Sequence, residues 1–515
     1  MDRLGSRSFL LMILALWVGA WIWVARFYYI DDTLIGLRYA DMLRQHGFLT
    51  FDGVHPSYGT SSVLYVVLLA AAGHILHSVF LPKVLSVIAY VTLLGITLRN
   101  ACKSRGVAQN LWVLLLIVFA SPMAVRWFTD GMETGLATAF ALMLGAGTFP
   151  DTKLPFGSRK PVVPMLLAFG AVFVRVEMAF LLAFVCLGNA AYRRAEMRSG
   201  GEARAWTRAI VREIQVAAGV ALALLAIWLM TGHMFSDAAI AKAQGFKPPV
   251  SYLMSVASSF AAALSLGVGL LLLWIPTMAG AWRHGGSAKL RALAVVNLAL
   301  PAEVFTAMVR GQGLAGIRYF LPAVVLMVAW NLAFLEATWR PAISVVTPGH
   351  ARSIFSPMSP PIVWGLAILM LGEWGYEGHR FKRIIDTHTA ALQEMRSQHL
   401  EVFAGQKGIA SDIGFISYFT DASICDMGGL VNGRQFAIAR PAERARRCAE
   451  SSPDFAFVNA GQGKELSPWI SFQGWPICHS YEFSNAFETD PHDLLVRPEM
   501  APLDCPQGNP AGAQP

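Results

Sequence analysis

The sequence has little charge for its length and lacks several of the short motifs that mark soluble enzyme chemistry. Only 14% of its 515 residues are charged, whereas 55% are hydrophobic and the mean hydropathy is +0.48. No Walker loop, H-E-x-x-H or C-x-x-C motif occurs, and no internal repeat of solenoid length is visible. Nucleotide-driven chemistry is therefore unsupported, and the composition is that of a protein whose solvent is a lipid bilayer.

What the chain does contain suits a membrane. Its 31 Phe and 15 Trp fit lipid-facing helices with interfacial anchors. Its net charge of +8 fits basic loops beside a negatively charged cytoplasmic leaflet better than it fits nucleic acid. The first apolar run, at about 9–29, follows Arg3 and Arg7. It is too long for a signal peptide and has no small-residue cleavage site, so we expect a retained first span with a cytoplasmic N-terminus.

Further apolar stretches follow, each near the length that a bilayer requires or somewhat short of it: about 62–79, 82–100, 110–126, 133–149, 161–190, 214–231, 253–277, 291–309, 317–337 and 361–374. The loops between them are of two sorts. One sort is basic, and the positive-inside rule places it in the cytoplasm: 99–105, 153–160, 193–212, 283–291 and 340–352. The other sort holds acids, Gly, Pro and aromatics and is expected to face the periplasm: 30–61, 126–134, 175–177, 232–252 and 310–318.

This alternation requires two exceptions. The stretch 62–79, diluted by His74 and His77, must be a tilted or re-entrant helix rather than a full crossing. The stretch 161–190 must bend near Arg175 into two short spans, because charge is tolerated at a helix break that faces water and is costly at the membrane centre. The expected fold is then a mainly α, polytopic bundle of about 10–11 spans over residues 1–375.

The character of the chain changes after about residue 375. Pro, Gly, Asp, Ser and Asn become more frequent and no further spanning run appears, so 376–515 is expected to form a soluble periplasmic α/β domain with a disordered end. Its cysteines are even in number, which suits two disulfides in an oxidising compartment. The alternative is free thiols. Three connectivities are open, and the simplest joins neighbours: Cys425 with Cys448 and Cys478 with Cys505.

Two adjacent acids directly follow the first span, in the segment DDTLIGLRYA at 31–40, and the loop continues to YGTSS at 58–62. One carboxylate could take the proton of an acceptor hydroxyl as general base, while the other could hold a divalent cation, a base or a sugar hydroxyl. The alternative is that Asp31 or Asp32 only caps the short helix that begins at Thr33.

Two further outer elements carry charge. The loop RWFTDGMET at 126–134 brings an aromatic, Trp127, to the same face as Asp130, and sugar sites commonly combine carboxylates with an aromatic plane. The alternative is an interfacial Trp127 with a capping Asp130. Arg175 and Glu177 are two residues apart, a spacing that prevents them from facing each other on a regular helix. Either the helix is broken there or they serve different partners.

Several cations lie on the outer face, against the positive-inside bias. His233 and Lys242 lie in the fourth outer loop, and Arg318 with Tyr319 in the fifth. An anionic ligand would explain them. A lipid phosphate suits, because Arg binds phosphate in bidentate geometry and Lys binds it as a point charge. The alternative is snorkelling toward phospholipid headgroups.

Taken in order, these segments resemble bacterial GT-C glycosyltransferases, and most closely the mycobacterial-type terminal arabinofuranosyltransferases that use decaprenyl-phosphoryl arabinose. The resemblance is carried by DDTLIGLRYA at 31–40, YGTSS at 58–62, GMET at 131–134, RVE at 175–177, AK at 241–242, RYFLP at 318–322, SDIGFISY at 411–418 and DMGGL at 426–430. It spans most of the chain. Two departures leave the transferred sugar open: RVEM at 175–178 replaces the family's Arg-Pro-Glu-Gly, and Ser61-Ser62 replaces its Asn-Pro.

The resemblance implies a large first outer loop, an acceptor cavity open to the periplasm and a lipid donor that enters from the bilayer. It implies Asp31 as the catalytic base, Asp32 as its helper and Glu133 as a substrate-orienting acid. It also implies three cations at the donor phosphate: Lys242, Arg318 and, less directly, Arg175. The remaining candidates would line the substrate site: Arg38, Tyr58, Trp127, Asp130, Glu177, His233 and Tyr319.

The expected activity is transfer of a sugar, arabinofuranose as the first choice, from a polyprenyl phosphate to a periplasmic glycan or glycoprotein at the inner membrane. A transferase of the same fold for mannose, aminoarabinose or an oligosaccharide is the nearest alternative. A lipid-linked-sugar transporter or flippase is the rival of another class, but it would place its charges near the bilayer midplane in two repeat-related halves. No organic cofactor is implied, and the sequence decides neither metal dependence nor inversion against retention.

Overall fold

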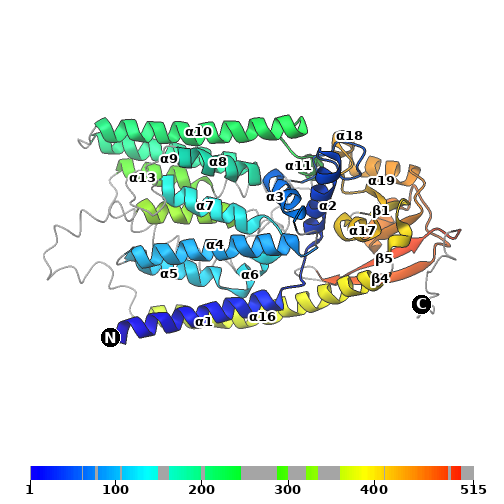
Figure 1. Cartoon of the computed structure of the whole chain (residues 1–515), viewed down its shortest axis with the longest axis horizontal. Helices are drawn as coiled ribbons and strands as arrows, with labels where there is room; N and C mark the ends of the chain where they lie inside the picture. The colour runs from blue at the N-terminus through cyan, green and yellow to red at the C-terminus, as the bar shows by residue number, and fades with distance from the viewer. Residues whose placement is uncertain are drawn as a thin grey trace.

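The structure is a computed structural model that describes residues 2–60, 62–75, 79–104, 107–148, 162–198, 203–244, 287–299, 321–334, 360–398, 400–410, 412–484 and 489–499. These residues form an elongated molecule, with a bundle of helices at one end and a small β-sheet domain at the other (Figure 1). The expected span 253–277 lies outside the described residues, as do Arg318, Tyr319 and Cys505.

Most helices of the bundle run along the long axis of the molecule (Figure 1). Their bounds are α1 (Asp2–Val24), α4 (Leu81–Lys103), α5 (Val107–Phe119), α6 (Pro122–Thr129), α7 (Thr134–Thr148), α8 (Val162–Val174), α9 (Met178–Arg198), α10 (Ala203–Thr231), α13 (Ser287–Asn297) and the helix Leu321–Phe334. Within the described residues, two helices are long and apolar enough to cross a membrane, Leu81–Lys103 and Ile210–Thr231, or three if one bent pair forms a single span.

That bent pair lies within one expected span. The stretch 110–126 was taken as a single unit, whereas α5 ends at Phe119 and α6 begins at Pro122, at an angle of 70° to it. The hydroxyl oxygen of Ser121 caps α6 by accepting a hydrogen bond from the backbone N–H of Ala124 at 3.1 Å. Proline fits the first helical position because the N–H that it lacks would be unpaired there. A new helix therefore starts at Pro122 in a different direction.

The two stretches that were expected to depart from a single straight span contain a short helix and a helix break. α3 (Val63–Gly73) has 11 residues, which is about 16 Å of helix, or roughly half the hydrocarbon thickness of a bilayer. α8 ends at Val174 and α9 begins at Met178, and the two helices pack against each other. The chain thus breaks where the charged pair Arg175 and Glu177 predicted a break.

Three short helices lie between the bundle and the sheet domain (Figure 1): α2 (Asp31–His46), α3 and α11 (Asp237–Gln244). α2 occupies much of the first outer loop and packs on α3 and on α17 (Ile413–Thr420) of the sheet domain. The helix is capped at its C-terminal end by Gly47, whose φ of 78° lets its N–H donate back to the carbonyl of Leu43 at 2.9 Å. The segments that contain α2, α3 and α11 therefore lie at the junction of the two parts.

The C-terminal domain is α/β, as expected. Its five-stranded sheet has the order β2-β1-β3-β5-β4. The strands are β1 (Lys407–Ala410), β2 (Ser423–Asp426), β3 (Phe455–Val458), β4 (Ile477–Ser484) and β5 (Thr489–Val496). β1 pairs in parallel with β2 and β3, since α17 and α19 (Pro441–Glu450) provide the crossovers, whereas β5 runs antiparallel to β3 and β4.

A long helix joins the two parts. α16 (Pro360–Ser397) runs beside α1 and continues to the sheet domain (Figure 1). Aromatic rings stack between the two helices, Trp17 on Trp374 and Trp21 on Phe381, each with centroids 5.8 Å apart. The change of composition near residue 375 therefore falls inside one continuous helix, and the first strand begins only at Lys407.

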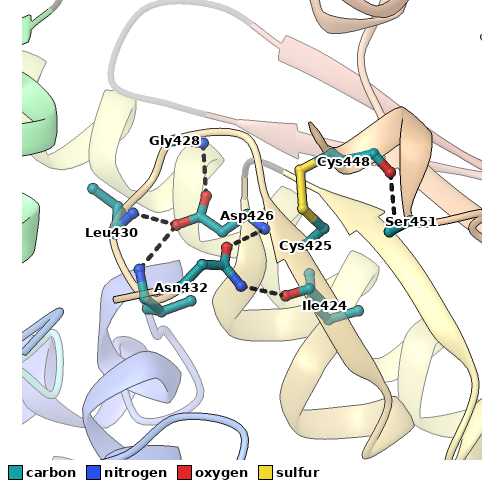
Figure 2. The surroundings of a disulfide bond; sticks show 9 residues. Ile424, Cys425, Asp426, Gly428, Leu430, Asn432, Cys448 and Ser451 are labelled. Atoms are coloured by element: carbon teal, nitrogen blue, oxygen red, sulfur yellow. Dashed lines mark hydrogen bonds between the residues drawn. A yellow bond between two sulfur atoms is a disulfide. The ribbon is translucent and has the colours of Figure 1, made fainter. Parts of the chain in front are cut away.

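A disulfide fastens β2 to α19. It joins Cys425 to Cys448, the neighbour pairing that the sequence makes simplest (Figure 2). Cys478 is also disulfide-bonded, whereas Cys102 and Cys186 in the bundle are free. The Cys425–Cys448 bond closes a loop with a sequence separation of 23 residues, which restricts the unfolded chain and so stabilises this end of the sheet.

Candidate active site

Asp31 is the first residue of α2, which follows α1 in the chain. The cap position of α2 is Ile30, so Asp31 does not cap its own helix. Its carboxylate accepts two backbone hydrogen bonds from α17, from Gly414 N to Oδ2 at 2.9 Å and from Phe415 N to Oδ1 at 2.8 Å. Asp31 therefore caps α17 of the soluble domain instead of the helix that contains Thr33. Asp32 lies beside it, half-buried.

The surroundings of Asp31 increase its affinity for a proton. Burial raises the pKa of this carboxyl group well above its usual range, and the nearby charge of Asp412 raises it further. The two N–H donors lower the pKa, because they bind the ionised form, but they do not outweigh burial. Asp412 is paired in turn with His492, whose Nε2 lies 2.6 Å from its Oδ2. A raised pKa makes the ionised Asp31 carboxylate a stronger proton acceptor.

The second acid-bearing loop ends in a buried ion pair. Oε1 of Glu133 accepts hydrogen bonds from Arg175 Nε at 3.0 Å and Nη2 at 2.7 Å, and the side chains are only 2% and 1% exposed. Oε1 of Glu177 lies 3.6 Å from Arg175 Nη1. The guanidinium of Arg175, which was also predicted to lie at the donor phosphate, contacts both of these carboxylates. The break between α8 and α9 therefore lets Arg175 contact Glu177, which their spacing of two residues would prevent on a regular helix.

Lys83, which the sequence reasoning missed, ties the two acid-bearing loops together. It lies in the first turn of α4 and is 6% exposed. Its ammonium donates to the carbonyl of Tyr28 at 3.1 Å and to the carbonyl of Thr129. Beside it, the Thr33 hydroxyl donates to the carbonyl of Asp130 at 2.9 Å. The loops before α2 and after α6 are therefore held in one arrangement.

Replacing Lys83 by Met is expected to lower the thermal midpoint in detergent and to weaken the site. Met fills a similar volume but leaves two buried carbonyls without their donor, which costs about 1–3 kcal/mol for each group. Lys103→Met, at the exposed far end of the same helix, is the matched control and should behave as wild type. Equal thermal midpoints for the two variants would show that Lys83 has no such role.

The short helix α11 presents Lys242 in its last turn and is anchored by Asp237 in its first. Asp237 Oδ2 accepts from Tyr58 N at 2.8 Å, and Asp237 N donates to the Tyr58 carbonyl at 2.6 Å. Arg434, from α18 (Arg434–Ala437) of the soluble domain, places Nη1 3.6 Å from Asp237 Oδ1. α11 is therefore held between the first outer loop and the soluble domain, with Lys242 half-buried.

The other candidates lie in different surroundings. Trp127 is buried, and the Arg126 guanidinium lies 4.9 Å from its ring centroid. Arg38, expected at the substrate, is buried and bonds to backbone carbonyls of the first loop and of α17. His233 is exposed beyond the end of α10. Among the described residues, no three His, Cys, Asp or Glu side chains are grouped to hold a metal ion.

The loop after β2 meets the first outer loop. Figure 2 shows the Asp426 carboxylate accepting from the backbone N–H groups of Gly428, at 2.7 Å, and Leu430. Burial raises the pKa of Asp426 to about 6, in opposition to these donors. The carbonyl of Leu430 comes so near Gly59 that a Cβ there would lie 2.4 Å from the oxygen. The segments YGTSS and DMGGL are thus direct neighbours.

Two crystal structures of ArnT from Cupriavidus metallidurans have this architecture. The structure bound to undecaprenyl phosphate has a TM-score of 0.53 and 10% identity, over 94% of this chain and 98% of that chain. The apo structure has a TM-score of 0.52 and 11% identity, over 96% and 99%. At these identities the likeness shows the fold alone, and it confirms the expected helix bundle followed by a C-terminal α/β domain. No protein-family model and no curated protein sequence matches the chain.

Proposed function

We propose that this protein is a membrane glycosyltransferase that takes a sugar, arabinofuranose as the first choice, from a polyprenyl phosphate. The observation that carries the proposal is its likeness, over 94% of its length, to a structure bound to undecaprenyl phosphate. Asp31 and the Glu133–Arg175 pair support it, because they belong to loops at the end of the bundle that faces the soluble domain. We propose that this end faces the periplasm and that the acceptor is a periplasmic glycan or glycoprotein.

In this reaction, an acceptor hydroxyl oxygen attacks the anomeric carbon while the bond from that carbon to the phosphate oxygen breaks. The bonding electrons leave with the phosphate, and the hydroxyl proton passes to Asp31. A carboxylate has about four lone-pair positions, and the two backbone donors occupy only two of them. Asp31 can therefore keep both contacts with α17 and still accept a proton. We assign Asp32 as its helper and Glu133, held by Arg175, as the acid that orients the sugar.

The leaving group needs little acid assistance, because it departs as a phosphate that a nearby cation stabilises. Lys242 supplies that cation in the proposal, together with Arg318 from outside the described residues. Lys242 fits because α11 is anchored at Asp237 both to the first outer loop and to the soluble domain. Arg175 is assigned to Glu133 and Glu177, since its guanidinium contacts both of them.

A donor titration of purified protein in detergent tests this assignment. Lys242→Ala is expected to raise the KM for a polyprenyl-phosphoryl sugar about 10-fold or more, because one charge-assisted phosphate contact contributes about 1.5–3 kcal/mol. Lys464→Ala, an exposed lysine on α20 (Ala460–Leu466) of the soluble domain, is the control. Wild-type turnover with an unchanged donor KM in Lys242→Ala would remove Lys242 from the donor site. Faster turnover of a mannosyl, aminoarabinosyl or oligosaccharyl donor would identify another sugar.

A further inference from the structure

α2 contacts both ends of α17. Asp31 at the start of α2 accepts hydrogen bonds from the first backbone N–H groups of α17. Arg38 lies seven residues later, which is about two helical turns and the same face of α2. Its Nη1 donates to the carbonyl of Ser417 at 2.7 Å and to Asp421 Oδ1, just beyond the end of α17, at 3.1 Å. One face of α2 therefore meets the whole length of α17.

The two contacts have matching charge. A helix carries partial positive charge at its N-terminus and partial negative charge at its C-terminus. The negatively charged Asp31 of α2 lies at the N-terminus of α17, and the positively charged Arg38 of α2 lies at its C-terminus. Arg38 is 8% exposed, and its Nε is also bound to the Phe51 carbonyl at 2.9 Å, so its position is fixed. This contact between α2 and α17, the α2–α17 dock, therefore holds a helix of the soluble domain against the first outer loop in one arrangement.

The backbones also approach so closely at this point that only glycine fits. A Cβ at Gly414 would lie 2.0 Å from the Asp31 carbonyl oxygen and 2.9 Å from its carboxyl carbon. No side-chain rotation can relieve the first contact, because the carbonyl is backbone. Any larger residue at position 414 must separate α17 from Asp31.

We propose that α17 is a positioning element of the active site, whose first N–H groups orient the Asp31 carboxylate for proton abstraction. This inference rests on the proposed function. It makes the soluble domain necessary for the chemical step rather than only for recognition of the acceptor. The charged groups that face Asp31 are Asp412, which precedes α17 and is paired with His492, and Asp32 on α2. Both acids oppose ionisation of Asp31, so the N–H donors are the groups that favour it.

The test is the pH dependence of kcat/KM for Gly414→Ala. Separation from α17 exposes the Asp31 carboxyl and moves Asp412 away, which weakens the two largest causes of its raised pKa. The acidic limb of the kcat/KM profile is therefore expected to move to lower pH, although two N–H donors are lost. The kcat should fall, and the donor KM should stay the same, because Lys242 is unaffected. Gly463→Ala is the matched control, since Gly463 is also a helical glycine of the soluble domain but has open space around its Cα.

Two further measurements separate the possible outcomes. Arg38→Gln loosens the opposite end of the dock without changing Gly414. It should move the acidic limb of the kcat/KM profile in the same direction as Gly414→Ala, by a smaller amount. Hydrogen exchange at residues 413–416 should be faster than wild type in both variants. Faster exchange with an unchanged pH profile would overturn the proposal, because the dock would then be structural only. A wild type that binds donor lipid without turnover would instead reject the proposed function, and this inference with it.

Discussion

Asp31→Asn is expected to lower sugar transfer by about 10²–10⁴-fold while donor binding persists. Asparagine has nearly the same size but cannot accept the proton of the acceptor hydroxyl. Its amide oxygen can still accept from one of the two N–H groups of α17, whereas its NH₂ group cannot accept from the other. The variant should therefore remain folded with a weakened dock, and the loss should appear in kcat rather than in the donor KM.

Asp32→Asn is the comparison for this prediction, because it changes the neighbouring carboxyl and leaves both contacts of Asp31 with α17 in place. It should retain clearly more activity than Asp31→Asn. Transfer by Asp31→Asn within about 5-fold of wild type would mean that another group is the base. An equal loss in both variants would mean that the two acids act as one unit and that Asp31 has no separate role.

Arg175→Met is expected to cause the largest loss of stability, about 3–5 kcal/mol, seen as a lower thermal midpoint in detergent. The reason is that two carboxylates then lose their cation: Glu133, which is 2% exposed, and Glu177, which is 8% exposed. An uncompensated buried charge is costly, whereas removal of both charges is much less so. The double variant Arg175→Met with Glu133→Gln should therefore recover part of the loss.

An exposed ion pair provides the control for this stability prediction. Lys382 and Asp386 are bonded at 2.6 Å, but their side chains are 60% and 59% exposed. Lys382→Met should change stability by less than about 1 kcal/mol. If Arg175→Met were no less stable than Lys382→Met, the pairing of Arg175 with Glu133 would not stabilise the fold. In that case, the original assignment of Arg175 to the donor phosphate would regain support.

The sequence predicted those features of the fold that follow from the energetics of a single segment. A charged pair inside an apolar stretch is costly, and this located the break at Arg175. The 70° bend after α5 was missed although Ser121 and Pro122 form a helix-start signal, because the apolar run was taken as one unit. The extent of α16 was also missed, since a change in composition does not end a helix.

The candidate site was predicted as a set of residues, but its contacts were not. Asp31 stood out as part of an acid doublet, yet its partner Gly414 is 383 residues away, and a backbone donor leaves no chemical signature in a sequence. The contact of Arg38 with the Ser417 carbonyl was missed for the same reason, because the two residues are also far apart in the sequence. Lys83 did leave a signal, a lone cation in the first turn of an apolar stretch, which is rare without a partner.

The most direct test of the proposed function is sugar transfer by the purified wild-type protein in detergent. Synthetic polyprenyl-phosphoryl arabinose would be the donor, and a fraction of cell-envelope glycans would be the acceptor. We expect acceptor-dependent release of polyprenyl phosphate, with the sugar recovered on the glycan. Binding of the lipid without turnover of this donor, or of its mannosyl, aminoarabinosyl and oligosaccharyl counterparts, would contradict a transferase and favour a carrier of lipid-linked sugars.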